Sequence, residues 1–278
     1  MATTSRIERL FASHTLDANK NNKAARSQSR LICFMTAGYP DIDTSSEIIN
    51  KLPEWGADLV EIGIPFSDAS ADGGTIREAS KIALENGINL GKVLDMAQSF
   101  RQVNPDTPLI LMGYYNPIFH YGPEKFAAAA TKAGVDGLII VDLPPEEEGE
   151  ITAHLPAELN LIHLITPTTD AERLQKIVAN AKGFLYYVSV TGTTGSATPD
   201  LFKVAKHLEE LAPSLPVAIG FGIRNASQVK EFGELGQAVV VGSALLSELM
   251  KMTQNGNSLQ NTQEKIATQV ASFKDALA

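Results

Sequence analysis

The sequence predicts an α/β fold, a (β/α)8 TIM barrel with extra N-terminal and C-terminal helices, and three observations support it. The 278-residue chain contains eight short apolar runs bounded by glycine, proline, aspartate or threonine, which is typical of strands buried on both faces. Amphipathic stretches separate these runs, so strands and helices alternate and the sheet should be parallel. No break in composition marks a domain boundary, which favours a single barrel domain over residues 1–278 rather than an open sheet.

The elements follow in order along the chain. The expected strands are Leu31–Met35, Leu59–Ile62, Leu109–Met112, Leu138–Val141, Leu161–Ile165, Phe184–Val188, Val217–Ile219 and Ala238–Val241. Between them, apolar residues recur at helical spacing, and one such stripe predicts a buried helix face made of Phe202, Ala205, Leu208 and Leu211. Residues that favour helix N-termini mark helix starts at Asp43–Ser45, Thr168–Asp170 and Asn225–Ser227.

Two helices are expected outside this alternation. A short apolar stripe, Ile7, Leu10 and Phe11, predicts a helix that plugs the N-terminal face of the barrel. A longer stripe within residues 266–277 predicts a helix packed on the outside of the barrel. The polar Gln254–Gln263 stretch before it is expected to be an exposed loop.

Composition and charge exclude several function classes. The net charge of -9 argues against a general nucleic-acid binder and against attraction to an anionic membrane. No apolar run reaches the ~18 residues that a membrane span needs, and the first thirty residues contain no apolar core of a secretory signal. Cys33 is the only cysteine, which excludes an internal disulfide and favours a reducing compartment. We expect a soluble, cytoplasmic protein.

Two carboxylates make the segment from Leu59 to Gly73 the most informative part of the sequence. Glu61 lies in an apolar run, and Asp72 follows eleven positions later in a glycine-rich loop that precedes a helix. Burying an unpaired charge is costly, so Glu61 is not expected to serve packing. Two carboxylates in one barrel mouth can divide acid and base roles if their environments separate their pKa values. The alternatives are a structural Glu61 satisfied by neighbouring donors and an Asp72 that only forms a turn.

Glycine-rich segments follow the last three expected strands, at the face where such barrels carry their sites. These segments are Val190–Ala197, Gly220–Ile223 and Val241–Ala244. Glycines let backbone N–H groups approach an anion, Thr194 and Ser243 add hydroxyl donors, and helix N-termini add their positive dipole ends. The succession predicts a phosphate site, the alternative being three turns. The Gly192–Pro199 stretch is expected to be a mobile lid over the substrate or an ordinary surface loop.

Several other polar residues are weaker candidates. Tyr186 lies in the sixth expected strand and is a candidate proton carrier or orienting group, with core packing as the alternative. Asp58 is expected to be structural, while Asp142 either supports Glu61 or caps a loop. The acidic run Glu146–Glu148 is expected on the solvated surface, where it opens a helix. The five histidines show no metal-ligand spacing, so no metal is expected. No nucleotide-binding motif occurs, so a nucleotide cofactor is not expected either.

Over nearly its full length the chain resembles the α subunit of tryptophan synthase. The segments that carry the resemblance occur in that family's order: Phe34–Asp41, Glu61–Asp68, Ala71–Gly73, Tyr114–Pro117, Gly137–Pro144, Tyr186–Ser189, Thr194–Gly195, Gly220–Ile223 and Val241–Ala244. The resemblance implies a lyase that cleaves indole-3-glycerol phosphate to indole and glyceraldehyde 3-phosphate by a retro-aldol reaction, with no cofactor in this chain.

The resemblance also implies a role for each candidate residue. Glu61 would be the general acid–base that protonates the indole ring carbon, Asp72 would accept the indole N–H, and Tyr186 would lie near the reacting glycerol. The implied phosphate-binding residues are Thr194, Gly195, Gly222, Gly242 and Ser243. The implied indole pocket consists of Phe34, Met112, Tyr114, Ile165 and Phe221.

A partner is implied as well. Members of the family work in an α2β2 heterotetramer with a β subunit that carries pyridoxal phosphate and receives indole through an internal tunnel. Ala69 and Gly74 stand where the family usually has proline, which predicts a looser loop and weaker coupling to the β subunit. The alternatives are a free-standing lyase that releases indole and a weakly catalytic, phosphate-binding regulatory subunit. A sugar-phosphate isomerase of similar architecture would share the phosphate site but not the segment around Glu61.

Overall fold

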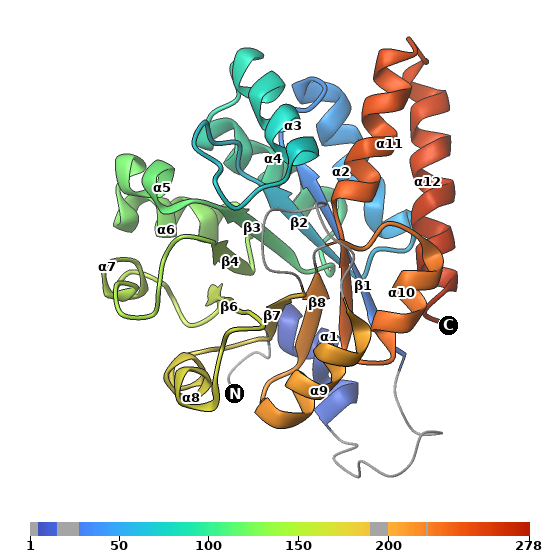
Figure 1. Cartoon of the computed structure of the whole chain (residues 1–278). Coiled ribbons are helices and arrows are strands. Elements are labelled where there is room, and N and C mark those ends of the chain that lie inside the picture. The colour runs from blue at the N-terminus through green and yellow to red at the C-terminus, as the bar shows by residue number, and fades with distance from the viewer. Residues whose placement is uncertain (1–4, 16–27, 190–199, 221) are drawn as a thin grey trace.

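The computed structural model describes residues 5–15, 28–189, 200–220 and 222–278, and within them nine parallel strands form one sheet surrounded by helices (Figure 1). The strand order is β5-β4-β3-β2-β1-β9-β8-β7-β6. The strands are β1 (Arg30–Thr36), β2 (Leu59–Gly63), β3 (Leu109–Gly113), β4 (Gly137–Ile140), β5 (Asn160–Leu161), β6 (His163–Ile165), β7 (Leu185–Val188), β8 (Val217–Gly220) and β9 (Ala238–Val241). Almost all of their residues are buried, as expected for strands covered on both faces.

The barrel closes through one short stretch of chain. β5 pairs with β4, whereas β6 pairs with β7 on the other side. Ile162, between β5 and β6, donates its amide to the carbonyl of Leu138 at 2.8 Å, which continues the ladder to β4 across the break. The single strand expected over Leu161–Ile165 is therefore two short strands, and the sheet is the expected parallel barrel with one interrupted member.

The register of the strands decides which side chains face the interior. Phe34 on β1 pairs with Glu61 on β2, and Glu61 pairs with Ile110 on β3. On β7, Tyr186 pairs with Leu164 of β6. Paired residues in neighbouring parallel strands point to the same face of a sheet. Glu61 and Ile110 therefore face the barrel interior together with Phe34, and Leu164 faces it together with Tyr186.

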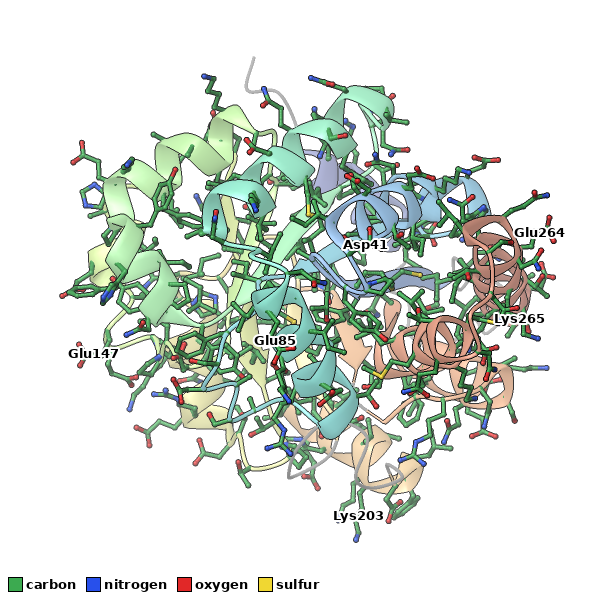
Figure 2. The ribbon with its side chains drawn as sticks, turned by 90° about the horizontal axis from the view of Figure 1, so that it is seen from above. Asp41, Glu85, Glu147, Lys203, Glu264 and Lys265 are labelled. Carbon is green, nitrogen blue, oxygen red and sulfur yellow. The ribbon has the colours of Figure 1, made fainter. Side chains whose placement is uncertain are left out.

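Helices cover the outside of the sheet and one end of the barrel (Figure 1). They are α1 (Arg6–Thr15), α2 (Ile42–Trp55), α3 (Gly74–Glu85), α4 (Leu90–Val103), α5 (Tyr115–Tyr121), α6 (Pro123–Lys132), α7 (Gly149–Thr152), α8 (Ala171–Val178), α9 (Leu201–Leu211), α10 (Ala226–Gly233), α11 (Ser243–Gln254) and α12 (Leu259–Asp275). Figure 2 shows charged side chains such as Glu147, Lys203 and Glu264 pointing away from the barrel. In the described residues, no helix combines the length and apolar character that crossing a membrane requires.

Side-chain caps start several of these helices. Asp170 and Asn225 accept the backbone amides of Arg173 and Gln228, so the expected starts of α8 and α10 are confirmed. The start of α2 was expected too late, because Asp41 is the cap and accepts the amide of Thr44.

The N-terminal helix α1 closes one end of the barrel, as expected. Ile7 is fully buried beside Gly137 and Gly183, which lie at the N-terminal ends of β4 and β7. The ring of Phe11 lies 5.4 Å from that of Phe184. Arg6 bonds to the carboxylate of Asp136 at 2.9 Å and fixes the helix to the barrel wall.

The C-terminal helix α12 packs beside α2 and α11 on the outside of the barrel (Figure 1). Its Lys274 bonds to Asp58 at 2.7 Å, and the same carboxylate accepts the amide of Leu31 at 2.7 Å. Asp58 is therefore structural, as expected. The loop expected over Gln254–Gln263 is wrong, because α11 and α12 leave only residues 255–258 between them.

The helix face expected over Phe202, Ala205, Leu208 and Leu211 is wrong at Phe202, whereas Leu208 and Leu211 are partly buried and pack against the core. The Phe202 side chain is 77% exposed, and Val204 is the buried residue of α9. The 3.6-residue spacing correctly predicts a helix here, but the face that packs on the barrel is rotated away from Phe202.

Candidate active site

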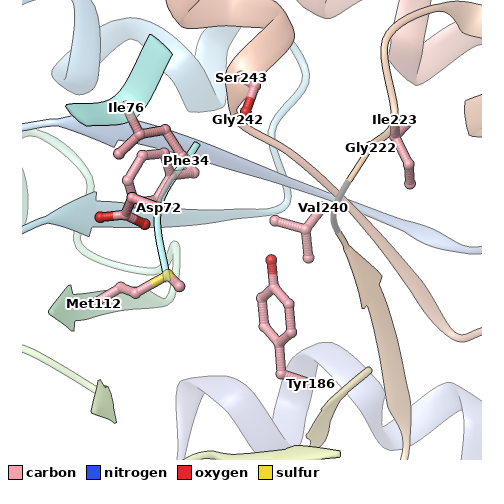
Figure 3. A pocket seen from close by; sticks show the side chains of 10 residues that line it. All are labelled: Phe34, Asp72, Ile76, Met112, Tyr186, Gly222, Ile223, Val240, Gly242 and Ser243. Carbon is pink, nitrogen blue, oxygen red and sulfur yellow. The ribbon is translucent and has the colours of Figure 1, made fainter. Parts of the chain in front are cut away.

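A cavity lies at the C-terminal ends of the strands and contains most of the expected site residues that the structure describes (Figure 3). Its walls come from β1, β3, β7 and β9 and from the segments after β2, β8 and β9. Figure 3 shows the Tyr186 hydroxyl pointing into the cavity, with Asp72 and Phe34 on another wall. The lining residues are Phe34, Asp72, Ile76, Met112, Tyr186, Gly222, Ile223, Val240, Gly242 and Ser243.

Glu61 is an uncompensated carboxyl group inside the barrel. It is fully buried, and within the described residues neither of its oxygens has a hydrogen-bond partner. Burial raises the pKa of Glu61 to about 8, since the charged form cannot be solvated there. The side chain is therefore protonated at neutral pH. This does not match the structural alternative, which required neighbouring donors for a charged Glu61.

Asp72 lies in the loop between β2 and α3, one residue before the N-cap of that helix. Burial raises the pKa of Asp72 to about 6, opposed by a hydrogen bond from Tyr114 and by the positive charge of Arg77. Asp72 is therefore mostly ionised at neutral pH, where Glu61 holds its proton. The two carboxyl groups differ in protonation state, which is the condition for dividing acid and base roles.

Tyr186 faces the same interior from β7. Burial, and then the charges of Glu61 and Asp72, raise the pKa of Tyr186 well above its usual value. The phenol therefore stays protonated and can donate a hydrogen bond into the cavity.

A glycine-bounded rim forms the part of the cavity expected to hold phosphate. Gly222 adopts a positive φ of 80°, which a side chain would strain. Gly242 is the N-cap of α11 and supplies no side chain to that helix, so its first amides are left for another acceptor. Ser243 is the first residue of α11 and adds a hydroxyl. Thr194 and Gly195, with the lid expected over Gly192–Pro199, lie outside the described residues.

The expected indole-contacting residues do not all line the cavity. Phe34 and Met112 line the cavity, whereas Tyr114 is buried beside it. Ile165 is also buried, but it pairs with Tyr187, on the opposite face of β7 from Tyr186. The predicted contact of Ile165 with the indole stays a prediction, and the register of β6 against β7 does not favour it. Phe221 lies outside the described residues.

Sequence reasoning missed four apolar residues near the cavity. Ile76, Ile223 and Val240 line it, and Leu164 shares the inward face with Tyr186. The runs around Leu164 and Val240 are apolar on both faces of the sheet, so no alternation in the sequence distinguishes inward from outward side chains.

Two other acidic candidates have structural roles. Asp142 accepts the amide of Tyr115 at 2.8 Å, so it caps the loop rather than supporting Glu61. The acidic run is not entirely on the surface, because Glu148 is buried and bonds to His163 at 2.6 Å. As the N-cap residue of the short helix α7, Glu148 turns toward β6, while its neighbour Glu147 remains exposed. The described part of the chain holds no group of three or more metal-ligating side chains.

Comparisons with known proteins agree with this arrangement. The family profile described as tryptophan synthase alpha chain matches residues 20–278. The tryptophan synthase alpha chain of Granulibacter bethesdensis is 46% identical over 250 residues, which cover 89% of this chain and 90% of the relative. That of a Caulobacter species is 44% identical over 278 residues, covering 99% and 97%. The crystal structure of tryptophan synthase subunit alpha from Legionella pneumophila is similar with a TM-score of 0.86 at 34% identity, over 99% of both chains.

Proposed function

The chain belongs to the tryptophan synthase alpha chain family and is an enzyme subunit of the lyase class, which cleaves indole-3-glycerol phosphate; from this premise we propose how its cavity performs the reaction. Protonated Glu61 delivers its proton to the indole ring carbon that carries the glycerol phosphate. Positive charge then builds on the ring nitrogen, and ionised Asp72 accepts the N–H that bears it.

The remaining steps return every proton. The bond between the protonated ring carbon and the glycerol carbon breaks, and its electron pair stays with the ring, which becomes indole. The hydroxyl on the glycerol carbon loses its proton to Glu61, now ionised, and becomes the aldehyde of glyceraldehyde 3-phosphate. Tyr186, which faces the same interior, donates a hydrogen bond that orients the glycerol hydroxyl. Glu61 ends as it began, so no cofactor is needed in this chain.

The substrate is held at both ends. The first amides of α11, with Gly242 and Ser243, bind the phosphate together with Gly222, and the helix dipole favours the negative charge. Thr194 and Gly195 complete this site in the proposal. Phe34 and Met112 contact the indole ring, with Tyr114 beside them. Ile165 and Phe221 remain predictions for this pocket.

One observation carries the proposal: Glu61 is fully buried in the barrel with no hydrogen-bond partner among the described residues, and Asp72 lines the cavity at the C-terminal ends of the same strands. A purely binding subunit would not require a carboxyl group without hydrogen-bond partners, because such a group destabilises the fold. The arrangement therefore supports catalysis over the regulatory alternative.

We also propose that the chain works in the cytoplasm with a tryptophan synthase β subunit as an α2β2 heterotetramer, and that pyridoxal phosphate belongs to that partner. The loop after β2 is where coupling would differ from relatives. Ala69 is buried in it, and Gly74 starts α3 with open space around it. Without the restriction of proline at these positions, we expect weaker activation by the partner.

The test is indole release from indole-3-glycerol phosphate by the purified chain, with and without a β subunit. Slow cleavage that increases strongly with the partner is the expected result. Fast cleavage that the partner leaves unchanged would identify a free-standing lyase. No cleavage in either mixture would overturn the catalytic roles of Glu61 and Asp72.

A further inference from the structure

Tyr114 connects the barrel wall to the loop that carries Asp72. It follows β3 directly, and its side chain is buried. Its hydroxyl oxygen accepts the backbone amide of Ala71 at 3.0 Å and also bonds to the carboxylate of Asp72. Its ring lies 5.4 Å from that of Phe66, near the start of the same loop. The Tyr114 side chain thus contacts the loop near both of its ends.

The direction of these hydrogen bonds follows from the chemistry of the groups. A phenol has one O–H donor, and an ionised carboxylate only accepts. Because the Ala71 amide donates to the Tyr114 oxygen, the phenolic proton remains for Asp72. Burial and the Asp72 charge raise the pKa of Tyr114, so the phenol keeps this proton throughout the working pH range.

Hydrogen bonds inside the loop set its turns. Ser70 donates to the carbonyl of Asp68 at 2.8 Å, and Asp72 donates to that of Ala69 at 3.2 Å. Both bonds are local and would persist if the loop moved as a unit. The contact with Tyr114 is of another kind, because it joins the loop to the residue that directly follows the neighbouring strand β3.

We propose that Tyr114 is a positioning residue for Asp72. The Tyr114 hydroxyl holds the Ala71–Asp72 backbone and orients the Asp72 carboxylate toward the indole N–H. This inference rests on the proposed function, but it assigns to Tyr114 a task beyond contact with the indole ring. The two tasks can be separated, because Tyr114→Phe keeps the ring and removes only the hydroxyl.

The ionisation of Asp72 should report this change. The groups that act on the Asp72 carboxyl are Arg77 on α3 and Tyr114, and Asp72 in turn raises the pKa of Tyr186, which faces it from β7. Arg77 and Tyr114 favour the ionised carboxylate. Removing the Tyr114 hydroxyl leaves burial opposed by Arg77 alone, so the pKa of Asp72 should rise further.

The experiment compares Tyr114→Phe with Tyr115→Phe. The control removes a similar bond, because the Tyr115 hydroxyl donates to Glu150 at 2.9 Å on the exposed surface. For Tyr114→Phe we expect kcat to fall by about tenfold or more, the scale of one hydrogen bond to a charged group, with little change in KM. The acidic limb of the kcat profile should move to higher pH. Tyr115→Phe should leave both unchanged.

A second readout does not depend on activity. The Asp72 carboxyl carbon is followed by NMR in protein made with ¹³C-labelled aspartate, with the signal assigned by its loss in Asp72→Asn. A higher apparent pKa of Asp72 in Tyr114→Phe, but not in Tyr115→Phe, supports the inference. An unchanged titration, or wild-type kcat and pH profile in Tyr114→Phe, overturns it. If the wild-type chain cleaves no substrate, the proposed function fails, and the titration still decides whether Tyr114 holds Asp72.

Discussion

The phenol of Tyr186 lies across the backbone of Gly220, so a Cβ atom added to Gly220 would fall 2.2 Å from the Tyr186 hydroxyl oxygen. The ring carbon that bears the hydroxyl would lie only 2.6 Å away. Real Cβ atoms essentially never make contacts this short, and the aromatic ring is rigid, so the whole Tyr186 side chain would have to move. Gly220, the last residue of β8, therefore provides the space through which Tyr186 reaches the cavity.

We expect Gly220→Ala to displace Tyr186 and to lower kcat/KM by up to about 10²-fold, because small misplacements near the reacting atoms are costly. Steady-state kinetics with indole-3-glycerol phosphate measures the loss, and a crystal structure shows the new Tyr186 rotamer. The matched control is Gly149→Ala, where an added Cβ meets no atom within 4 Å. Equal kinetics in the two variants would show that the Tyr186 position does not matter for the reaction.

The pH dependence of kcat/KM should be bell-shaped. Activity rises as Asp72 loses its proton, with a pKa of about 6, and falls as Glu61 loses its proton, with a pKa of about 8. The profile is measured between pH 5 and 9 with indole release as the signal, a range chosen to bracket both limbs by roughly one unit. A profile that stays flat from pH 7 to pH 9 would contradict the role of Glu61 as the proton donor.

The substrate phosphate also titrates near pH 6 and could mimic the acidic limb. Competitive inhibition by glyceraldehyde 3-phosphate, measured over the same range, reports phosphate ionisation without proton transfer to the ring. An acidic limb that persists in kcat at saturating substrate belongs to Asp72. A limb present only in kcat/KM and in product inhibition belongs to the phosphate.

Glu61→Gln should lower kcat by roughly 10²–10⁴, the usual scale for losing a general acid–base, while substrate binding survives. Gln fills the same space but cannot deliver a proton. Single-turnover cleavage and binding of the substrate are measured separately. Asp72→Asn is the companion variant, and we expect a similar loss with folding intact. Wild-type turnover in Glu61→Gln would remove Glu61 from the mechanism.

The same Glu61→Gln variant should become more stable than the wild type as the pH rises. The folded-state pKa of Glu61, about 8, lies above its usual value of 4.5. Between these values the folded protein holds a proton that the unfolded chain has released, so the free energy of unfolding falls with increasing pH. Gln does not titrate and avoids this loss. The difference should be smallest below pH 4.5 and reach the order of a few kcal/mol above pH 8.

Urea unfolding at a series of pH values measures this difference, with Glu147→Gln as the control at an exposed carboxylate. The control should remain close to the wild type throughout. A constant difference between Glu61→Gln and the wild type across the pH range would mean that Glu61 titrates normally in the folded protein.

The sequence was sufficient to predict the barrel and to single out two buried carboxyl groups, for a physical reason. Carboxylates within or beside buried apolar runs are costly, so Glu61 and Asp72 are conspicuous, and parallel strands bring the segments that follow them to one mouth. Apolar side chains carry no such signal. Leu164 and Ile165 are equally plausible inward residues until the register with β7 is known, because the strand is covered on both faces.

Surface elements were harder to predict for a related reason. Spacing indicates that a helix exists, but the face that packs depends on the neighbours it meets, as the exposed Phe202 and the buried Val204 show. Glu148 illustrates the converse case. A carboxylate in an acidic run is expected in water, yet the chain turns Glu148 toward His163, 15 residues further along the sequence.

Helix α1 closes the N-terminal end of the barrel, so within the residues that the structure describes the interior is open only toward the C-terminal ends of the strands. Ile7 and Phe11 fill this end, so substrate and products reach and leave the described cavity at the opposite, C-terminal end. In the chain without its partner, the substrate and both products therefore pass through the same end of the barrel. Whichever product leaves second determines when the next substrate can enter, and the order of departure, as much as the chemistry at Glu61, would set the pace of the cycle.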